Sequence, residues 1–405
     1  MLGRLLAADP GHRGPRLPCG QGHEAGFTDY RDKVIDTVLG PVTLTRAWYH
    51  CGACKHGFAP RDIELGVAGT SLAPGLAAMN DTAAAAGPFA KAAGLLENLA
   101  GVSLTVKRVE RAAEASGATQ AAAVRERSSL IAGRKLVPMP PSPCPDMLYG
   151  AIDGTGVTMT AKETAGREGK GPDGRARTRE VKLGVFFTQD DVDDDGHPVR
   201  DRDSASYIAT FEPAAVFGEM VKAEGIRRGA DHVRQLTILG DGAAWIWTIA
   251  TGKFPEATQI VDLFHAREHL HDLARQLEFM LLDHKQEWLE ARLEDLDYGD
   301  IDAICREARA FPLEGTRKDE LDTALGYFEH NAPRMRYKWF RSRGLFVGSG
   351  AVESGCKAVI GQRLKLSGMR WTVAGAGAIT TLRCQQASRP EDRIWLARHN
   401  QTVPA

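Results

Sequence analysis

The chain has 405 residues, 43% of them apolar and 25% charged, with a formal net charge of −1 at pH 7. This composition excludes an intrinsically disordered chain and a protein that is basic throughout, and no apolar run approaches the roughly 18 residues of a membrane helix. Seven scattered cysteines and a start without the apolar stretch of a signal peptide favour a reduced, cytoplasmic protein of roughly two to four domains.

Residues 1–75 are predicted to form a small β-rich module. LGPVTLTRAWYHC is rich in β-branched and aromatic residues, and it runs into a CxxC pair of the kind that binds zinc. A second, irregular half of the motif precedes it by about thirty residues. The segment is therefore predicted to be zinc-ribbon-like, with a structural Zn²⁺ on Cys19, His23, Cys51 and Cys54.

The histidine is the weakest member of this ligand set, because related ribbons have a second CxxC in its place. His50 and His56 are alternatives to His23, and a module that binds no zinc is a third interpretation.

Residues 76–135 are Ala-rich and predicted to be helical, with interruptions at Gly87-Pro88 and Gly101. Within them, residues 91–115 resemble a helix-turn-helix in which Ser103 caps the second helix. Its outer face would carry Lys107, Arg108 and Arg111 as DNA-binding residues, although two plain surface helices explain the pattern equally well. Residues 136–146, LVPMPPSPCPD, hold five prolines and are predicted to be a linker.

An α/β pattern follows the linker. Strands are predicted at 147–160, 180–189 and 205–211, a helix at 212–226, a strand at 235–241, a helix at 243–252 and a strand at 258–264. This order is the layout of an RNase H-like catalytic domain. Its first part spans 147–265, an all-α insertion spans 266–345, a closing helix lies within 346–390, and 391–405 form a tail.

Three acids have a place in that layout. The first and fourth strands of such a sheet are parallel neighbours, so Asp153 and Asp241 are expected at one edge. Glu353 is the only acid among nine Lys and Arg between residues 334 and 370. Converging carboxylates hold pairs of Mg²⁺ or Mn²⁺ ions for phosphoryl transfer, so these three are the predicted metal ligands. An i,i+4 pair of Glu353 with Lys357 is the plainer alternative.

Basic residues around this predicted edge indicate DNA binding. Residues 334–343, RMRYKWFRSR, alternate basic with aromatic side chains. This pattern suits contacts with DNA phosphates together with stacking on nucleobases, although the aromatic residues are equally compatible with a core position. The loop 162–179 is equally compatible with a DNA-contacting loop and a plain hairpin. The predicted DNA-binding residues here are Arg175, Arg177, Arg334, Arg336, Lys338, Arg341, Arg343, Lys357, Arg363, Lys365 and Arg370.

Four strings carry a resemblance to a known family: IDGTGV, LGDGAAWIW, VDLFHAREH and GSGAVESGCKAVIGQRLKLSGMRW. They are similar to the DDE transposases of bacterial insertion sequences, specifically the ISKra type, and the N-terminal CxxC region extends the similarity over most of the chain. The resemblance implies a bacterial, nucleoid-associated enzyme that cuts and joins DNA with Asp153, Asp241 and Glu353 as metal ligands. It also implies a (C/D)xxH motif at Asp262 and His265. A strand-end acid capping the next helix and a partly buried histidine are the alternative for this pair.

The predicted activity is cleavage at transposon ends and strand transfer to target DNA, by a homo-oligomer on double-stranded DNA. A transposase-derived DNA-binding protein without activity is the second hypothesis. A zinc protease is a third, because His265, Glu268 and His269 match HxxEH. The Asp191-x-Asp193-x-Asp195-Gly196 string is not predicted to bind calcium, because Arg202 stands where a loop of this kind needs a glutamate.

Overall fold

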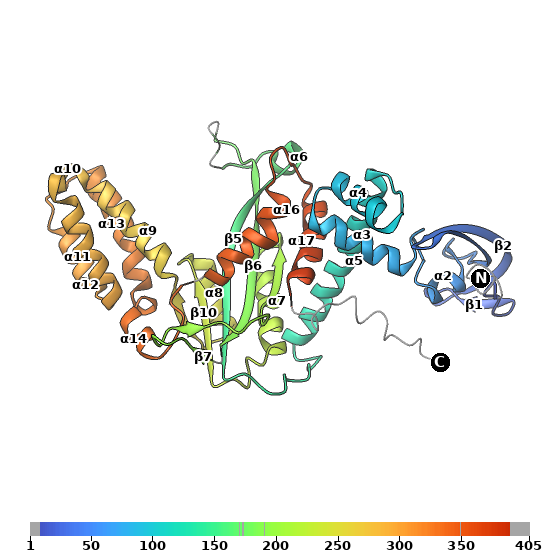
Figure 1. Ribbon diagram of the computed structural model, residues 1–405, viewed down its shortest axis with the longest axis horizontal. Coiled ribbons are helices and arrows are strands. Elements are labelled where there is room, and N and C mark those ends of the chain that lie inside the picture. Colours follow the sequence, from blue (N-terminus) through green and yellow to red (C-terminus); the bar gives the residue numbers. More distant parts are fainter. Residues whose placement is uncertain (1–8, 170, 172–173, 190, 349, 389–405) are drawn as a thin grey trace. The chain divides into compact units, whose positions relative to one another are not determined.

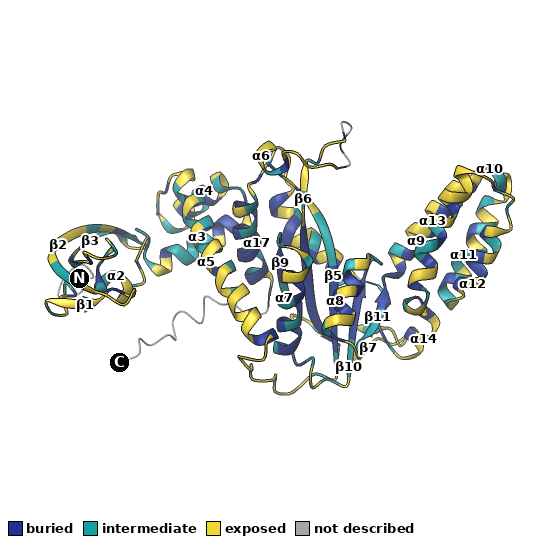
Figure 2. Cartoon of the chain, turned by 180° about the vertical axis from the view of Figure 1, so that it is seen from behind, coloured by how far each residue is buried: buried dark blue, intermediate teal, exposed yellow. Residues whose placement is uncertain are grey.

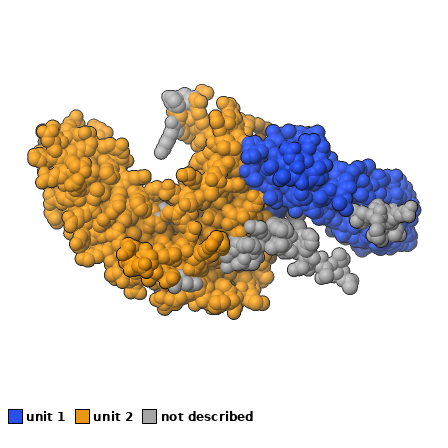
Figure 3. All heavy atoms as spheres, in the orientation of Figure 1, with its two compact units in different colours: residues 1–120, 393–405 blue, residues 121–392 orange. Residues whose placement is uncertain are grey.

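The structure is a computed structural model that describes residues 9–169, 171, 174–189, 191–348 and 350–388 (Figure 1). The chain divides into two compact units, one containing residues 9–120 and the other residues 121–388 (Figure 3). The expected tail, 391–405, lies outside the described residues.

Unit 1 begins with a four-stranded antiparallel sheet in the order β1-β2-β3-β4. A tight turn joins β2 to β3, and Gly40 after it has a φ of +104°, which favours glycine. Alternate side chains of the sheet bury a small cluster that contains Cys19, Ala25, Ala47, Tyr49 and Cys51. The strands are Arg16–Pro18, Glu24–Thr37, Gly40–His50 and Gly57–Phe58, and the short helix α2, Pro60–Glu64, follows them.

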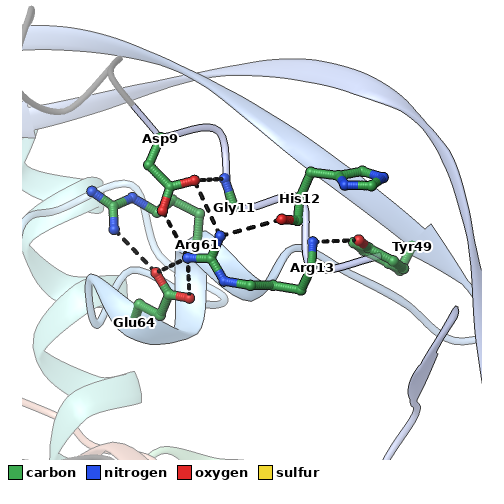
Figure 4. Close-up of polar contacts among 7 residues, drawn as sticks. All are labelled: Asp9, Gly11, His12, Arg13, Tyr49, Arg61 and Glu64. Carbon is green, nitrogen blue, oxygen red and sulfur yellow. Dashed lines mark hydrogen bonds and ion pairs between the residues drawn. The ribbon is translucent and has the colours of Figure 1, made fainter. Parts of the chain in front are cut away.

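Ion pairs attach the segment before β1 to this module (Figure 4). The Arg13 guanidinium lies 2.8 Å from carboxylate oxygens of both Asp9 and Glu64, and its backbone N–H donates to the Tyr49 hydroxyl at 2.9 Å. The bond from Arg13 and the Gly11 N–H hold the pKa of Asp9 at about 2. These exposed pairs fix the path of the chain more than they stabilise it.

Three helices follow the sheet of unit 1: α3 (Pro74–Ala86), α4 (Phe89–Ala100) and α5 (Val106–Ala132), of which only α5 extends past residue 120, where unit 1 ends. The breaks fall at Gly87-Pro88 and Gly101, as predicted, and Gly101 ends α4 in the left-handed conformation with a φ of +65°. The predicted cap is wrong by two residues. Thr105, not Ser103, stands before α5, and its hydroxyl accepts from the Arg108 N–H at 3.3 Å. Residues 136–146 form neither helix nor strand.

Unit 2 is built on a five-stranded mixed sheet in the order β11-β10-β5-β6-β9 (Figure 2). β5 and β10 are parallel neighbours, as predicted, whereas β6 is antiparallel to both β5 and β9. The strands are Met147–Thr158, Thr178–Gln189, Ser206–Thr210, Gln235–Gly240 and Thr258–Val261. A short helix α6 (Ala161–Thr164) and a hairpin of β7 (Asp191–Val192) and β8 (Pro198–Val199) lie between them.

Helices cover both faces of this buried sheet (Figure 2). Successive residues of a strand face opposite sides. A Cβ at Gly184 of β6 would meet Phe217 of α7 (Ala214–Arg227). A Cβ at Gly355 of α15 (Gly350–Gly355) would meet Leu183, the preceding residue of β6. We infer that α7 and α15 lie on opposite faces. Helix α8, Ala244–Lys253, packs against α7.

The segment after β11 is helical, as predicted. Helix α9 contacts α11 and α13, and α12 contacts α11 and α13, so these four form one bundle. The bounds are Leu263–Gln276 for α9, Glu278–Leu281 for α10, Lys285–Tyr298 for α11, Ile301–Arg309 for α12, Thr316–Asn331 for α13 and Tyr337–Ser342 for α14, with 3-10 turns at Leu282–His284 and Ala332–Arg334.

The closing segment differs from the single closing helix expected within 346–390. Helix α15 continues into a π-helical stretch, Cys356–Gly361, and a last turn α16, Gln362–Leu364. A π-helix places its residues around the axis differently from an α-helix, so the 3.6-residue spacing does not predict which of them face the sheet. A further helix, α17 (Val373–Ala387), packs on β9.

Candidate functional site

Asp153 and Asp241 lie at the same edge of the unit 2 sheet. Ile152 of β5 is in register with Gly240 of β10, so the next residue of each parallel strand is one of the two acids. Asp153 pairs in register with Leu183 of β6 and therefore shares the face that α15 covers. The carboxyl ends of parallel strands are where open α/β sheets bind ligands.

The Asp153 carboxylate is partly buried and accepts two hydrogen bonds. One oxygen accepts from the Gly154 N–H at 2.6 Å, and the other accepts from the Cys356 thiol at 3.2 Å. Burial is the main cause that raises the pKa of Asp153, and the Asp241 carboxylate adds to it, while Cys356, Gly154 and His265 act in the opposite direction. A bound cation would offset both the burial and the repulsion, so this pair of hard oxygen donors fits a divalent metal ion.

The N-terminus of α9 brings two further predicted residues to this region. β11 ends at Val261, and Asp262 caps α9 by accepting from the His265 N–H at 2.8 Å. This bond makes Asp262 the helix-capping acid that the alternative interpretation expected, and its side chain is buried, at 2% exposed. His265 is close enough to Asp153 to lower its pKa, and its Nδ1 lies 3.3 Å from a carboxylate oxygen of Glu268.

Glu353 lies on α15, which packs against β5 and β6, but its side chain is exposed. Among the described residues, the carboxylates of Asp153, Asp241 and Glu353 do not form a group with ligand atoms within 4.8 Å of one another. Within the described part of the chain, the Lys357 Nζ also forms no ion pair within 4.0 Å of a Glu353 carboxylate oxygen. The fold thus gathers two of the three predicted acids.

The predicted cationic residues of unit 2 divide into three sets. Arg334 is half-buried, packs over the Trp247 ring at 4.7 Å and donates to Gln259 at 2.8 Å. The prediction that Arg363 contacts DNA is wrong: its side chain is 0% exposed and lies over the Trp371 ring, where no DNA phosphate has access. The exposed set is Arg175, Arg177, Arg336, Lys338, Arg341, Arg343, Lys357, Lys365 and Arg370.

The aromatics of 334–343 also divide. Tyr337 and Phe340 are fully buried, as the core interpretation expected. Trp339 is 40% exposed, and the guanidinium groups of Arg336 and Arg343 lie 4.5 and 5.1 Å from its ring centre. This exposed cluster presents positive charge beside an aromatic surface.

The predicted helix-turn-helix residues have different surroundings. Lys107 and Arg111 are exposed on α5, and Lys107 lies 2.9 Å from Glu110. Arg108 instead pairs with Asp36 of β2 and donates to Ser71 at 2.8 Å, so it attaches α5 to the rest of unit 1.

A second candidate site lies in unit 1. Two turns, one between β1 and β2 and one between β3 and β4, bring together the ligand atoms of Cys19, His23, Cys51 and Cys54 within 4.8 Å of one another. The Cys19 and Cys54 sulfurs are 3.8 Å apart. Two thiolates, each about 2.3 Å from a tetrahedral zinc ion, would be about 3.8 Å apart. His23 belongs to this group of described residues, whereas His50 and His56 do not.

The electrostatics of this cluster also suit a metal. The Cys54 N–H is the main cause that holds the pKa of Cys51 at about 7, with help from the Ala53 N–H and the neighbouring thiols. The His56 N–H favours a Cys54 thiolate, but the Cys51 and Cys19 sulfurs and burial outweigh it and raise the pKa of Cys54. Two adjacent thiolates are stabilised together by a cation, so the set can hold a zinc ion.

The HxxEH alternative is not supported by the described geometry. The ring of His269 is stacked on Tyr327 at 3.7 Å, and burial is the main cause that lowers the pKa of His269. In the part of the chain that the structure describes, no group of three metal-ligating side chains within 4.8 Å includes His265 or His269. Asp193, Asp195 and His197 do form such a group, but they are exposed at the hairpin tip, as expected for a solvated loop.

Two residues of the acidic edge were not found from the sequence. The only local signal for Cys356 is its place three residues after Glu353, which puts it on nearly the same side of a helix. Tyr327 donates its hydroxyl to the Asp241 carbonyl at 3.0 Å from 86 residues away, and no local signal indicates that contact.

No protein-family model and no curated protein matches the chain. A comparison of structures finds a weak similarity to the Drosophila P element transposase strand transfer complex, with 10% identity, 84% of each chain covered and a TM-score of 0.26. A TM-score this low carries no argument about the fold or the activity of this chain. In the described residues, no helix is both long and apolar enough to cross a membrane.

Proposed function

We propose that this protein is a DDE transposase of the ISKra type, which cleaves DNA at transposon ends and joins the freed 3′-hydroxyl to target DNA. The observation that carries the proposal is the register of the adjacent parallel strands β5 and β10, in which Asp153, midway along β5, is level with Asp241, the residue directly after β10. The strand order β11-β10-β5-β6-β9, in which β6 alone of these five runs antiparallel to β5, is also the order expected of an RNase H-like domain.

Asp153 and Asp241 would hold Mg²⁺ or Mn²⁺, which supplies Lewis acidity to the scissile phosphate and to the attacking water or hydroxyl. The residues of the chain provide the orientation. The Gly154 N–H and the Cys356 thiol fix the two oxygens of Asp153, and the Ala243 N–H fixes one oxygen of Asp241 at 2.9 Å. Carboxylates held in this way need little reorganisation when the ion arrives.

Glu353 is the proposed third ligand. It lies three residues before Cys356, whose thiol already contacts Asp153, so the helix that carries Glu353 is anchored at the same edge. The small residues around it, Gly350, Ala351, Ser354 and Gly355, leave space for a nucleic acid to approach.

DNA would be held by the exposed cations of unit 2 and, in unit 1, by Lys107 and Arg111. Phosphate contacts of this kind position a duplex without reading its sequence. Lys365 contacts Thr155, two residues after Asp153 on β5, so one of these cations lies beside the proposed metal ligands. A homo-oligomer on DNA follows from the need to hold two transposon ends together, and the zinc module and α5 would bind those ends.

A metal-dependent cleavage assay tests this function. Duplex DNA with the sequences that flank the gene is incubated with the full-length protein and Mn²⁺ or Mg²⁺, and nicks are mapped on both strands. Wild-type protein is expected to cut at a defined position, and Asp241→Asn to lose at least about 100-fold in rate, because a neutral amide is a poor ligand for a hard cation. Asp302→Asn, at an exposed acid on α12, is the matched control.

A DNA-binding protein without cleavage activity is the second candidate, and the exposed position of Glu353 favours it. Binding of terminal sequences without any metal-dependent cutting would select that candidate. Cutting that is equal in wild type and Asp241→Asn would exclude the DDE mechanism.

A further inference from the structure

The turn that carries Asp241 depends on a glycine. Gly242 has a φ of +101°, in the region that side chains other than glycine rarely adopt. The Asp241 carboxylate accepts from the Ala243 N–H at 2.9 Å, which closes the turn onto the start of α8. The direction of the free carboxylate oxygen therefore depends on the backbone of three residues, 241–243.

Tyr327 of α13 packs directly on this turn. Its hydroxyl donates to the Asp241 backbone carbonyl at 3.0 Å, and a Cβ at Gly242 would lie only 2.5 Å from the edge of its ring. The ring and the hydroxyl thus contact two consecutive residues, which fixes the plane of the peptide between them. Burial is the main cause that raises the pKa of Tyr327, so the hydroxyl stays protonated and able to donate.

Two aromatic neighbours hold Tyr327 in place. His269 of α9 is stacked on its ring with centroids 3.7 Å apart, and Phe328, which is fully buried, meets it edge to face at 5.3 Å. His269 is one turn after His265, in the first half of α9, the half that begins beside the acidic edge. The helical segment between β11 and α15 therefore contacts the edge through a tyrosine whose own position is fixed.

We propose that Tyr327 is a positioning residue, through which the helical insertion sets the orientation of the Asp241 carboxylate for a divalent metal ion. The inference rests on the proposed function, since it assigns a task to the same acidic edge. It gives the insertion a role in assembling the metal site, in addition to any contact it makes with DNA.

Binding of Mn²⁺ to the zinc-loaded, full-length protein, followed by the loss of the free-ion electron paramagnetic resonance signal, tests the inference without requiring activity. Tyr327→Phe removes only the hydroxyl, so the dissociation constant for Mn²⁺ is expected to rise about threefold to tenfold, the equivalent of one hydrogen bond. Gly242→Ala, which places a methyl group against the ring, is expected to raise it further.

Tyr149→Phe is the matched control. The Tyr149 hydroxyl donates to Gln189 at 2.5 Å in the interior of the same sheet, near the start of β5 and four residues before Asp153. Its removal is expected to lower the melting temperature and to leave Mn²⁺ binding unchanged. A shift in Tyr149→Phe as large as that in Tyr327→Phe would show a general loss of stability and would overturn the inference.

The remaining outcomes also decide it. Mn²⁺ binding that is the same in Tyr327→Phe and wild type, or that does not respond to Asp241→Asn, overturns the positioning role. Mn²⁺ binding that weakens in Tyr327→Phe supports that role even if wild-type protein fails to cleave DNA, and in that case only the proposed function is lost. In an active enzyme, the half-saturating Mn²⁺ concentration for cleavage is expected to shift by the same factor.

Discussion

Replacing Cys51 with serine tests the zinc site at its most buried ligand. Cys51 is 0% exposed and packs with Ala25, Ala47 and Tyr49, so the serine hydroxyl would lie in an apolar cluster and bind zinc poorly. Structural zinc contributes about 10–16 kcal/mol of binding free energy in small modules. Divided over four ligands, this is about 2.5–4 kcal/mol each, which corresponds to a loss of roughly two to three orders of magnitude in affinity.

The measurement is a competition with a chromophoric chelator, combined with zinc content after dialysis and thermal unfolding. Wild-type protein is expected to retain one zinc ion per chain, and Cys51→Ser to release it at chelator concentrations that leave wild type loaded. Unit 1 of the variant should unfold at a lower temperature, because a ligand that binds only the folded state stabilises it. Cys144→Ser, at an exposed cysteine outside the cluster, is the control and should behave as wild type.

Two histidine variants in the same experiment distinguish which histidine is the fourth zinc ligand. His23→Ala should weaken zinc binding, whereas His56→Ala should not, because only His23 belongs to the described ligand group. Full zinc affinity in Cys51→Ser, or the opposite ranking of the two histidine variants, would refute the assignment of these four ligands.

Three further predictions concern unit 2. Gly355→Ala should destabilise the protein by about 1–3 kcal/mol in thermal or urea unfolding, because its Cβ would lie 2.8 Å from a tyrosine ring of β9. Gly350→Ala on the same helix is the control: its Cβ meets nothing within 4 Å, so the variant should be neutral or slightly stabilising. Equal effects of the two substitutions would contradict the packing of α15. Burial raises the pKa of Glu224, but its partners, first the half-buried Arg227 and then Ser206 and Arg228, outweigh this and lower the pKa below the unfolded value. The stability that Glu224 contributes is therefore present above about pH 4.3 and lost as the pH falls. Glu224→Gln should therefore lower the free energy of unfolding by about 3 kcal/mol near neutral pH and by progressively less in acid. Glu212→Gln, at an exposed ion pair, is the control and should lower it by less than about 1 kcal/mol. A difference between Glu224→Gln and wild type that does not change with pH would contradict this reasoning. Arg343→Ala should weaken duplex binding and reduce the slope of log affinity against log salt by about 1, and an unchanged slope would remove this residue from the interface.

Much of the chain could be predicted from its sequence because the signals are local. Short apolar runs predicted the five strands of the large unit 2 sheet in their order along the chain, and Gly101 marked the end of α4 because a left-handed residue there favours glycine. The CxxC pair indicated a metal site because two cysteines on one turn are already near each other. Asp262 could be recognised as a helix cap, since its partner is only three residues away.

Only the tertiary structure decided which of the predicted residues act together. Arg363 has the same local signature as the exposed Arg343, yet packing against Trp371 buries it completely. The contact of Cys356 with Asp153 spans 203 residues, and that of Tyr327 with the Asp241 turn spans 86. Such contacts depend on how helices pack on a sheet, which residue spacing along the chain does not encode.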